Sequence, residues 1–200
     1  MNYHIIGKSN KLISLLLDSI YEIHKSGLDI QIVKNIEVDN FPPFKFDNVK
    51  SFRISSIFDD EWDGNFQKIL MGVIRVPTKI AVYKSFNNSH GIKPNDFNNI
   101  IHPSSIISIQ SSIGNGVFIG PGTIISPYVE IKNLVTINRQ VSIGHHTSIG
   151  SFSTLNPGCT LAGGIVVGKN TTIGMGANIY NDINIGSNTV IGAGSLVTKN

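Results

Sequence analysis

Aliphatic residues recur at every sixth position of the chain from Ile101 to Val197. The fourth residue after each of them is small or β-branched, and the residue directly after is often glycine. No α-helix has a period of six residues, and a simple amphipathic strand has a period of two. A short repeat of constant length is typical of a parallel β-helix, in which stacked coils bury one continuous core. We therefore predict an all-β parallel β-helix over residues 101–200.

The repeat also predicts the direction of individual side chains. The recurring aliphatic residue and the small residue four positions later should point inward, which places Cys159 in the core. His145 comes two positions after the inward Ile143 and should therefore point outward. The glycines that follow the aliphatic residues suit tight corners, because glycine tolerates backbone conformations that a Cβ atom would block.

Residues 1–87 follow a different pattern, in which short apolar runs alternate with helical spacing. Helical spacing covers residues 12–23 and resumes after Pro77, which suits the first turn of a helix. Apolar runs typical of strands lie at residues 3–6, 28–33 and 67–74. Alternating strands and helices predict a small parallel, Rossmann-like α/β sheet. Residues 88–100, rich in asparagine, are expected to form a linker.

Composition narrows the classes of function. The chain has 200 residues, a net charge of +3 and one cysteine. Only four lysines or arginines lie beyond Ile101, and no cation cluster is visible, so a nucleic-acid surface is not expected. A single cysteine excludes an internal disulfide and fits a reducing compartment. No signal peptide or membrane-length apolar stretch is seen, and we expect a soluble, cytoplasmic protein.

The first turn of the chain is a candidate anion site. A strand, a small-residue turn and a helix would place backbone N–H groups of Gly7, Lys8 and Ser9 at a helix N-terminus. The turn lacks the later glycines of a dinucleotide fingerprint, so NAD is not expected. Asp39 and Asn40 follow the second predicted strand, where such side chains can contact a nucleotide. For both segments a purely structural turn remains the alternative.

Taken together, these features resemble one family, the sugar-nucleotide N-acyltransferases, which are close kin of the sialic acid O-acetyltransferases. Besides the order of domains, five short segments carry the resemblance: Ile5-Ile6-Gly7, Val38-Asp39-Asn40, Ile101-His102-Pro103, Ile143-Gly144-His145 and Leu161-Ala162-Gly163. The resemblance implies left-handed coils, a homotrimer with active sites between subunits, and an acyl-coenzyme A donor. It also implies a dTDP- or UDP-linked amino sugar as acceptor in surface-glycan biosynthesis, and no metal.

The resemblance assigns His145 as the catalytic base. An amine that attacks a thioester must lose a proton, and histidine titrates in the range this step needs. Many relatives carry an acidic residue where this chain has His146, and adjacent residues at a corner are expected to point in different directions. The resemblance further implies contacts with the acceptor from Asn138, Arg139 and His146. It implies contacts with the acyl-CoA or its oxyanion from Gly163, Gly174, Ala193 and Gly194.

Three functions therefore stay open from the sequence. The first is N-acylation of a nucleotide-linked amino sugar by acetyl-CoA or another short-chain acyl-CoA. The second is O-acetylation of a sugar such as sialic acid, and the third is a non-catalytic binding or scaffold solenoid. A zinc enzyme is disfavoured, because a catalytic zinc needs three ligands and residues 101–200 offer only His102, His145 and His146.

Overall fold

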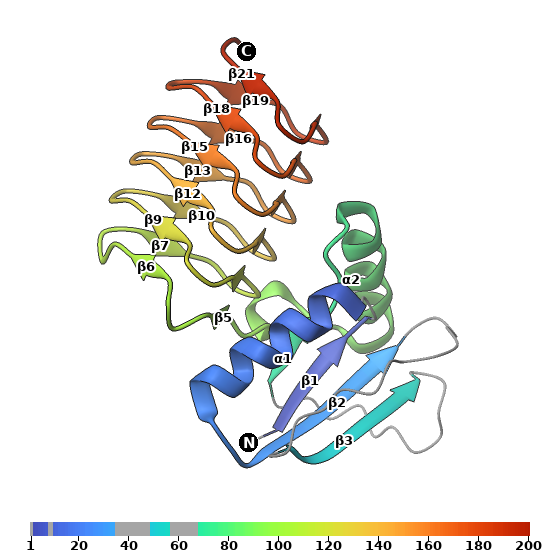
Figure 1. Ribbon diagram of the computed structural model, residues 1–200. Helices are drawn as coiled ribbons and strands as arrows, with labels where there is room; N and C mark the ends of the chain where they lie inside the picture. The colour runs from blue at the N-terminus through green and yellow to red at the C-terminus, as the bar shows by residue number, and fades with distance from the viewer. Residues whose placement is uncertain (1, 8–9, 35–48, 57–67) are drawn as a thin grey trace.

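The computed structural model describes residues 2–7, 10–34, 49–56 and 68–200. Figure 1 shows an α/β region at the N-terminus and a β-helix that rises from it, with the C-terminus at the far end of the stack. Both parts of the predicted fold class are confirmed, an α/β region with a small parallel sheet and a left-handed parallel β-helix.

The N-terminal sheet has the order β3-β2-β1-β4, and all of its strands run parallel. Helix α1 packs on it because its apolar side chains recur three to four residues apart and are buried. Helix α2 begins with proline in its first turn and ends at Gly91, whose φ of 65° lets its N–H reach the Asn87 carbonyl. The elements are β1 (Asn2–Ile6), α1 (Asn10–His24), β2 (Leu28–Lys34), β3 (Val49–Ser56), β4 (Ile69–Met71) and α2 (Val76–His90).

Helix α2 includes the first three residues of the segment expected as a linker. The rest of that segment holds the short 3-10 helix η1 (Pro94–Asp96), and the first strand of the β-helix begins at Ile100. Phe97 is buried and pairs with Ile69 of β4 in a parallel bridge. The connection between the two parts is therefore anchored to the sheet at Phe97.

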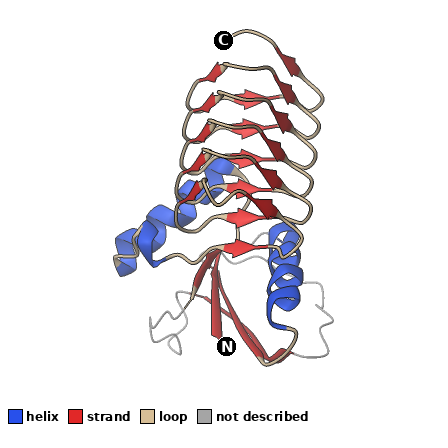
Figure 2. Ribbon diagram, turned by 90° about the vertical axis from the view of Figure 1, so that its left-hand side faces the viewer, coloured by secondary structure: helices blue, strands red, loops and turns tan. Residues whose placement is uncertain are grey.

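The β-helix consists of three parallel sheets, in which each strand pairs with the strands one coil before and after it. Ile143, for example, lies between Ile125 and Leu161, each 18 residues away. We name the sheets the β5, β6 and β7 faces after their first strands, and Figure 2 shows the short strands of successive coils stacked one above another. The β5 face contains β5 (Ile100–Ile101), β8 (Phe118–Ile119), β11 (Thr136–Ile137), β14 (Thr154–Leu155), β17 (Thr172–Ile173) and β20 (Val190–Ile191). The β6 face contains β6 (Ile106–Ile107), β9 (Ile124–Ile125), β12 (Ser142–Ile143), β15 (Thr160–Leu161), β18 (Asn178–Ile179) and β21 (Leu196–Val197). The β7 face contains β7 (Ser112–Ile113), β10 (Glu130–Ile131), β13 (Ser148–Ile149), β16 (Val166–Val167) and β19 (Asn184–Ile185).

The core of the β-helix is built from the two positions predicted to point inward. Cys159 is fully buried there as expected, and burial raises the pKa of its thiol to about 12. At several coils the small inward residue is polar, and its hydroxyl bonds the coil that follows. The Oγ1 atom of Thr123 donates to the Asn138 carbonyl at 2.8 Å, and that of Thr171 donates to the Gly186 carbonyl at 2.9 Å.

The glycines that directly follow the aliphatic residues were expected to supply an unusual backbone conformation at tight corners, and this expectation is wrong. Positive φ angles recur every six residues along the β-helix, but at the third residue after the aliphatic one, as at Gly158 and Asn170. The glycines directly after the aliphatic residues are needed for close approach between coils. A Cβ atom at Gly144 would lie 2.5 Å from the Ala162 carbonyl carbon, and one at Gly150 would lie 2.5 Å from the Lys169 nitrogen.

A buried lysine joins the two parts of the molecule. Lys79 of α2 is 0% exposed, and its Nζ atom reaches the β5 face. It donates to the hydroxyls of Thr136 (2.8 Å) and Thr154 (3.1 Å) and lies within 3.2–3.4 Å of the carbonyl oxygens of Leu134, Phe152 and Ser153. Because these acceptors belong to two successive coils, one side chain ties α2 to the stack.

We expect Lys79 to make stability depend on pH. Burial lowers its pKa from the ordinary 10.5 to about 7. Between about pH 7 and 10.5 this lysine is protonated in the unfolded chain but not in the folded one. Its contribution therefore makes the free energy of unfolding rise with pH, by at most about 1.4 kcal/mol per pH unit. The K79M variant should lose this contribution. Urea unfolding of both proteins at several pH values in this range measures it.

The control for this measurement is the K84M variant, because Lys84 lies on the same helix with an exposed side chain. Its stability should follow the wild-type pH dependence. A difference in unfolding free energy between wild type and K79M that stays constant across the range would contradict this role for Lys79.

Candidate active site

His145 and His146 lie at the corner between β12 and β13, where the chain passes from the β6 face to the β7 face. We call the stack of turns at this edge the histidine corner; it comprises residues 108–111, 126–129, 144–147, 162–165 and 180–183. Both imidazoles are exposed, as predicted for His145 from its place in the repeat. The histidine corner therefore presents two adjacent imidazoles to the outside of the β-helix.

The His145 ring lies against Gly163, the equivalent residue of the next coil. A Cβ atom at Gly163 would be 2.5 Å from Cε1 of His145, 2.8 Å from Nε2 and 3.0 Å from Nδ1. The imidazole thus fills the space that any other side chain at position 163 would need. In the part of the chain that the structure describes, no residue accepts a hydrogen bond from the Gly163 N–H. The His145 ring consequently lies against a residue whose N–H has no partner among the described residues.

The two histidines point toward each other, contrary to the expectation for adjacent residues at a corner. Their Nδ1 atoms are 3.0 Å apart, and the rings meet edge to face with centroids 5.2 Å apart. The left-handed backbone of His146, with φ of 55°, makes this contact compatible with a sharp turn. Since one Nδ1 must donate and the other accept, the two neutral rings hold opposite tautomers.

Three further side chains lie in the same column of the histidine corner as His146, one or two coils away from it. The Tyr128 ring packs on the His146 ring with centroids 4.8 Å apart, and the Gln110 amide donates to the Tyr128 hydroxyl at 3.0 Å. On the other side, Asp182 leans over Gly164, where a Cβ atom would be 2.2 Å from its Oδ1. Our sequence reasoning missed all three. Counting whole coils of 18 residues from His146 would have found them.

The remaining β-helix residues assigned to the site lie at a different corner, between the β5 and β6 faces: Asn138, Arg139, Gly174, Ala193 and Gly194. Asn138 is 4% exposed, and its side-chain oxygen accepts from the Arg139 N–H at 3.1 Å. Gly174 lies against the Ala193 nitrogen of the next coil. Within the described parts of the chain, no hydrogen bond joins Asn138 to His145, so one chain alone does not bring the two groups of residues together.

In the α/β region, the structure places Gly7 directly after β1, beside β4, where the order of the strands reverses. Its φ is 79°, and its N–H donates to the Val33 carbonyl at 2.9 Å. A Cβ atom there would be 2.6 Å from Cγ2 of Val73, so the turn needs glycine for its own packing. The other residues assigned to this part, Lys8, Ser9, Asp39 and Asn40, lie outside the described residues.

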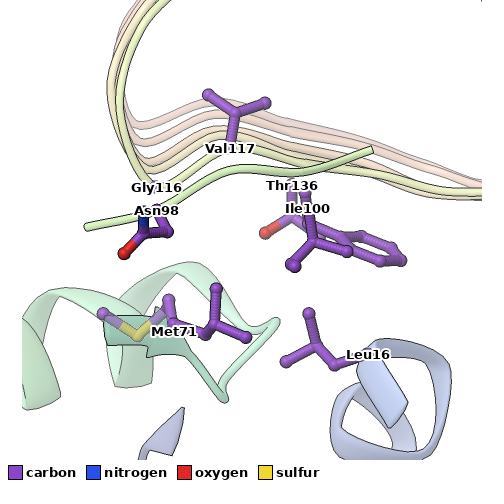
Figure 3. A pocket seen from close by; sticks show the side chains of 9 residues that line it. Leu16, Met71, Asn98, Ile100, Gly116, Val117 and Thr136 are labelled. Carbon is purple, nitrogen blue, oxygen red and sulfur yellow. The ribbon is translucent and has the colours of Figure 1, made fainter. Parts of the chain in front are cut away.

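A small crevice lies at the seam between the α/β region and the first coils, away from the histidine corner. Figure 3 shows Leu16 of α1 and Met71 facing Ile100 across it. Most of its lining is apolar, and it carries no ionisable side chain. We interpret the crevice as imperfect packing between two cores and not as a substrate site.

Neither a group of metal-ligating side chains nor a membrane-spanning helix is found in the described ranges. Among these residues, no three histidine, cysteine, aspartate or glutamate side chains are grouped to hold a metal ion. None of the helices described here has the length and hydropathy required to cross a membrane.

Comparisons with known proteins agree with this architecture. The family described as "Bacterial transferase hexapeptide (six repeats)" matches residues 164–199. The acetyltransferase domain of PglB from Neisseria gonorrhoeae FA1090 shares the fold at a TM-score of 0.79 and 18% identity, over 100% of this chain and 92% of that one. PerB from Caulobacter crescentus, solved with CoA and GDP-perosamine, has a TM-score of 0.79 and 22% identity, over 100% and 90%. A search of curated proteins found no match.

We expect the G163A variant to displace the His145 ring without unfolding the protein. The added methyl group would contact the end of an exposed side chain, which can move away, so the loss of stability should be below about 1 kcal/mol. The Hε1 resonance of His145 in NMR spectra, assigned with the H145N variant, should shift. G186A is the matched control, because a Cβ atom there meets nothing closer than 3.6 Å. An unchanged His145 resonance in G163A would disprove the contact.

Proposed function

We propose that this protein is an acyl-CoA-dependent N-acyltransferase that transfers an acetyl or other short acyl group to the amine of a nucleotide-linked amino sugar. The observation that carries the proposal is the His145 ring held against the Gly163 backbone at an exposed corner of the β-helix. An imidazole beside an N–H donor without a partner supplies a base and an oxyanion contact, which acyl transfer needs. The solved acetyltransferases that share the fold support the same class of reaction.

In the proposed mechanism, the amine of the sugar attacks the thioester carbonyl while Nε2 of His145 takes its proton. The carbonyl oxygen becomes negative in the tetrahedral intermediate and accepts a hydrogen bond from the Gly163 N–H. The carbon–sulfur bond then breaks, and the proton on His145 passes to the departing CoA thiolate. The products are the amide and free CoA, and His145 returns to its neutral form.

The nucleotide part of the acceptor is proposed to bind at the carboxyl end of the N-terminal sheet. The carboxyl end of β1 lies where the strand order reverses, and ligands of open α/β sheets bind at such points. Gly7, Lys8, Ser9, Asp39 and Asn40 are the proposed contacts to the nucleotide. PerB was solved with GDP-perosamine, so guanosine joins thymidine and uridine among the nucleobases to be tested.

A homotrimer is proposed to complete the site. The histidine corner and the corner that carries Arg139 lie on opposite edges of the β6 face. That face exposes Ile106 and Ile124 on adjacent coils, at 66% and 47%, and Leu196 on its last strand, at 69%, and a second copy would cover these side chains. With such packing, Asn138 and Arg139 of one copy would meet the acceptor at His145 of another. Gly174, Ala193 and Gly194 would border the pantetheine arm of CoA, in a protein that works in the cytoplasm.

The test is release of free thiol from acetyl-CoA in the presence of dTDP-, UDP- and GDP-linked amino sugars. At least one sugar should be acylated, and the H145N variant should lower kcat roughly a hundredfold or more, because it removes the base. H102N, which removes another histidine of the β-helix, should keep the wild-type rate. The absence of turnover with every sugar, or a wild-type rate in H145N, would refute the proposal.

A further inference from the structure

We infer that His146 is a positioning residue whose Nδ1 accepts the hydrogen bond of the His145 Nδ1–H and so leaves Nε2 of His145 free to take a proton. The inference deepens the proposed function and rests on it. A neutral imidazole carries one proton on two nitrogens, and only the unprotonated nitrogen can act as a base. The tautomer of His145 therefore decides whether its Nε2 atom can act as the base.

The geometry supplies both halves of this arrangement. The Cε1 atom of His145 is the part of the ring nearest to Gly163, and Nε2 lies slightly closer to the Cβ position of Gly163 than Nδ1 does, at 2.8 Å against 3.0 Å. Nδ1 lies 3.0 Å from Nδ1 of His146. If His146 were the donor instead, His145 would carry its proton on Nε2, and the base would be blocked. Only a His145 donor and a His146 acceptor leave Nε2 available.

His146 is itself held in place across three coils. Tyr128 packs on its ring, and Gln110 fixes the Tyr128 hydroxyl. Both Tyr128 and His146 adopt the left-handed backbone conformation that recurs at this position of the repeat, with φ of 62° and 55°. The same position one coil later is Gly164, with φ of 71°, so the turn itself does not require an aromatic side chain. The stack is therefore better explained by support of the histidine pair than by the needs of the corner.

The arrangement also limits the protons that the pair can hold. One proton lies between the two Nδ1 atoms, and a second proton there would set two N–H groups against each other at 3.0 Å. When Nε2 of His145 takes the amine proton, the resulting imidazolium keeps its Nδ1–H bond to neutral His146, and charge strengthens such a bond. The acceptor in this chain is thus a neutral ring, and the pair carries its positive charge on His145.

The test is the tautomer of His145 in the full-length protein without substrates, measured by long-range ¹H–¹⁵N NMR at about pH 9, where an ordinary imidazole is neutral. We expect the Nδ1–H tautomer in the wild type. The H146F variant keeps an aromatic ring at this backbone conformation, which Phe152 also adopts with φ of 64°, but it has no acceptor. His145 should then change to mainly the Nε2–H form, whereas in H146N the amide oxygen should restore the Nδ1–H form.

Kinetics provide a second readout. H146F should lower kcat roughly tenfold or more with KM nearly unchanged, and H146N should recover most of the loss, because positioning acts on the chemical step. H102N serves as the control and should alter neither the tautomer nor the rate. An Nε2–H tautomer of His145 in the wild type, or a tautomer that H146F does not change, would overturn the inference. Since the NMR measurement needs no turnover, it decides the matter even where the proposed function fails.

Discussion

The pairing of each coil with the next is the constraint on which the rest of the structure depends. Backbone bonds such as Gly144 N–H to the Leu161 carbonyl, at 2.8 Å, recur at the same offset throughout the β-helix. They hold residues 18 positions apart side by side, within the roughly 5 Å spacing of neighbouring strands. A residue without a side chain is then required wherever the next coil comes closest. The same register that builds the core therefore decides which side chains meet on the surface.

The histidine corner is a direct result of this register. Gly163 lies one coil beyond His145 and offers both room for the ring and a spare N–H, while Tyr128 lies one coil before His146 and supports it. The α/β region is attached by the same geometry, because Lys79 bonds acceptors of two successive coils. Catalytic groups on such a scaffold need no flexible loop for their placement. The proposed site residues lie on two separate corners, the histidine corner and the corner that carries Arg139, and this separation is the reason to propose a second copy at the site.

Much of the fold can be predicted from the sequence, because the six-residue period reports directly on inward and outward positions. It places Cys159 inside and His145 outside, and the alternation of the first 87 residues predicts the parallel sheet. It does not predict that Lys79 bonds two successive coils, because the sequence of a helix does not reveal that one of its lysines is buried against hydrogen-bond acceptors. The period also fails for contacts between neighbours, as at His145 and His146, which depend on the φ angle of one residue.

The candidate site was predictable only in part, for a related reason. A resemblance to a family assigns residues one at a time, and it assigned His145 and Gly163 without the contact between them. That contact, the support from Tyr128 and the carboxylate of Asp182 above Gly164 follow from the stacking of coils. Residues of the first α/β turn, such as Lys8 and Ser9, lie outside the described residues, and their contacts stay predictions.

The most direct test of the central claim is a crystal structure of the protein with CoA and a nucleotide-linked amino sugar. We predict that the CoA sulfur and the sugar amine meet at His145, close to Gly163, between the histidine corner of one copy and the Arg139 corner of another. CoA bound within a single copy, with its sulfur away from His145, would contradict the account.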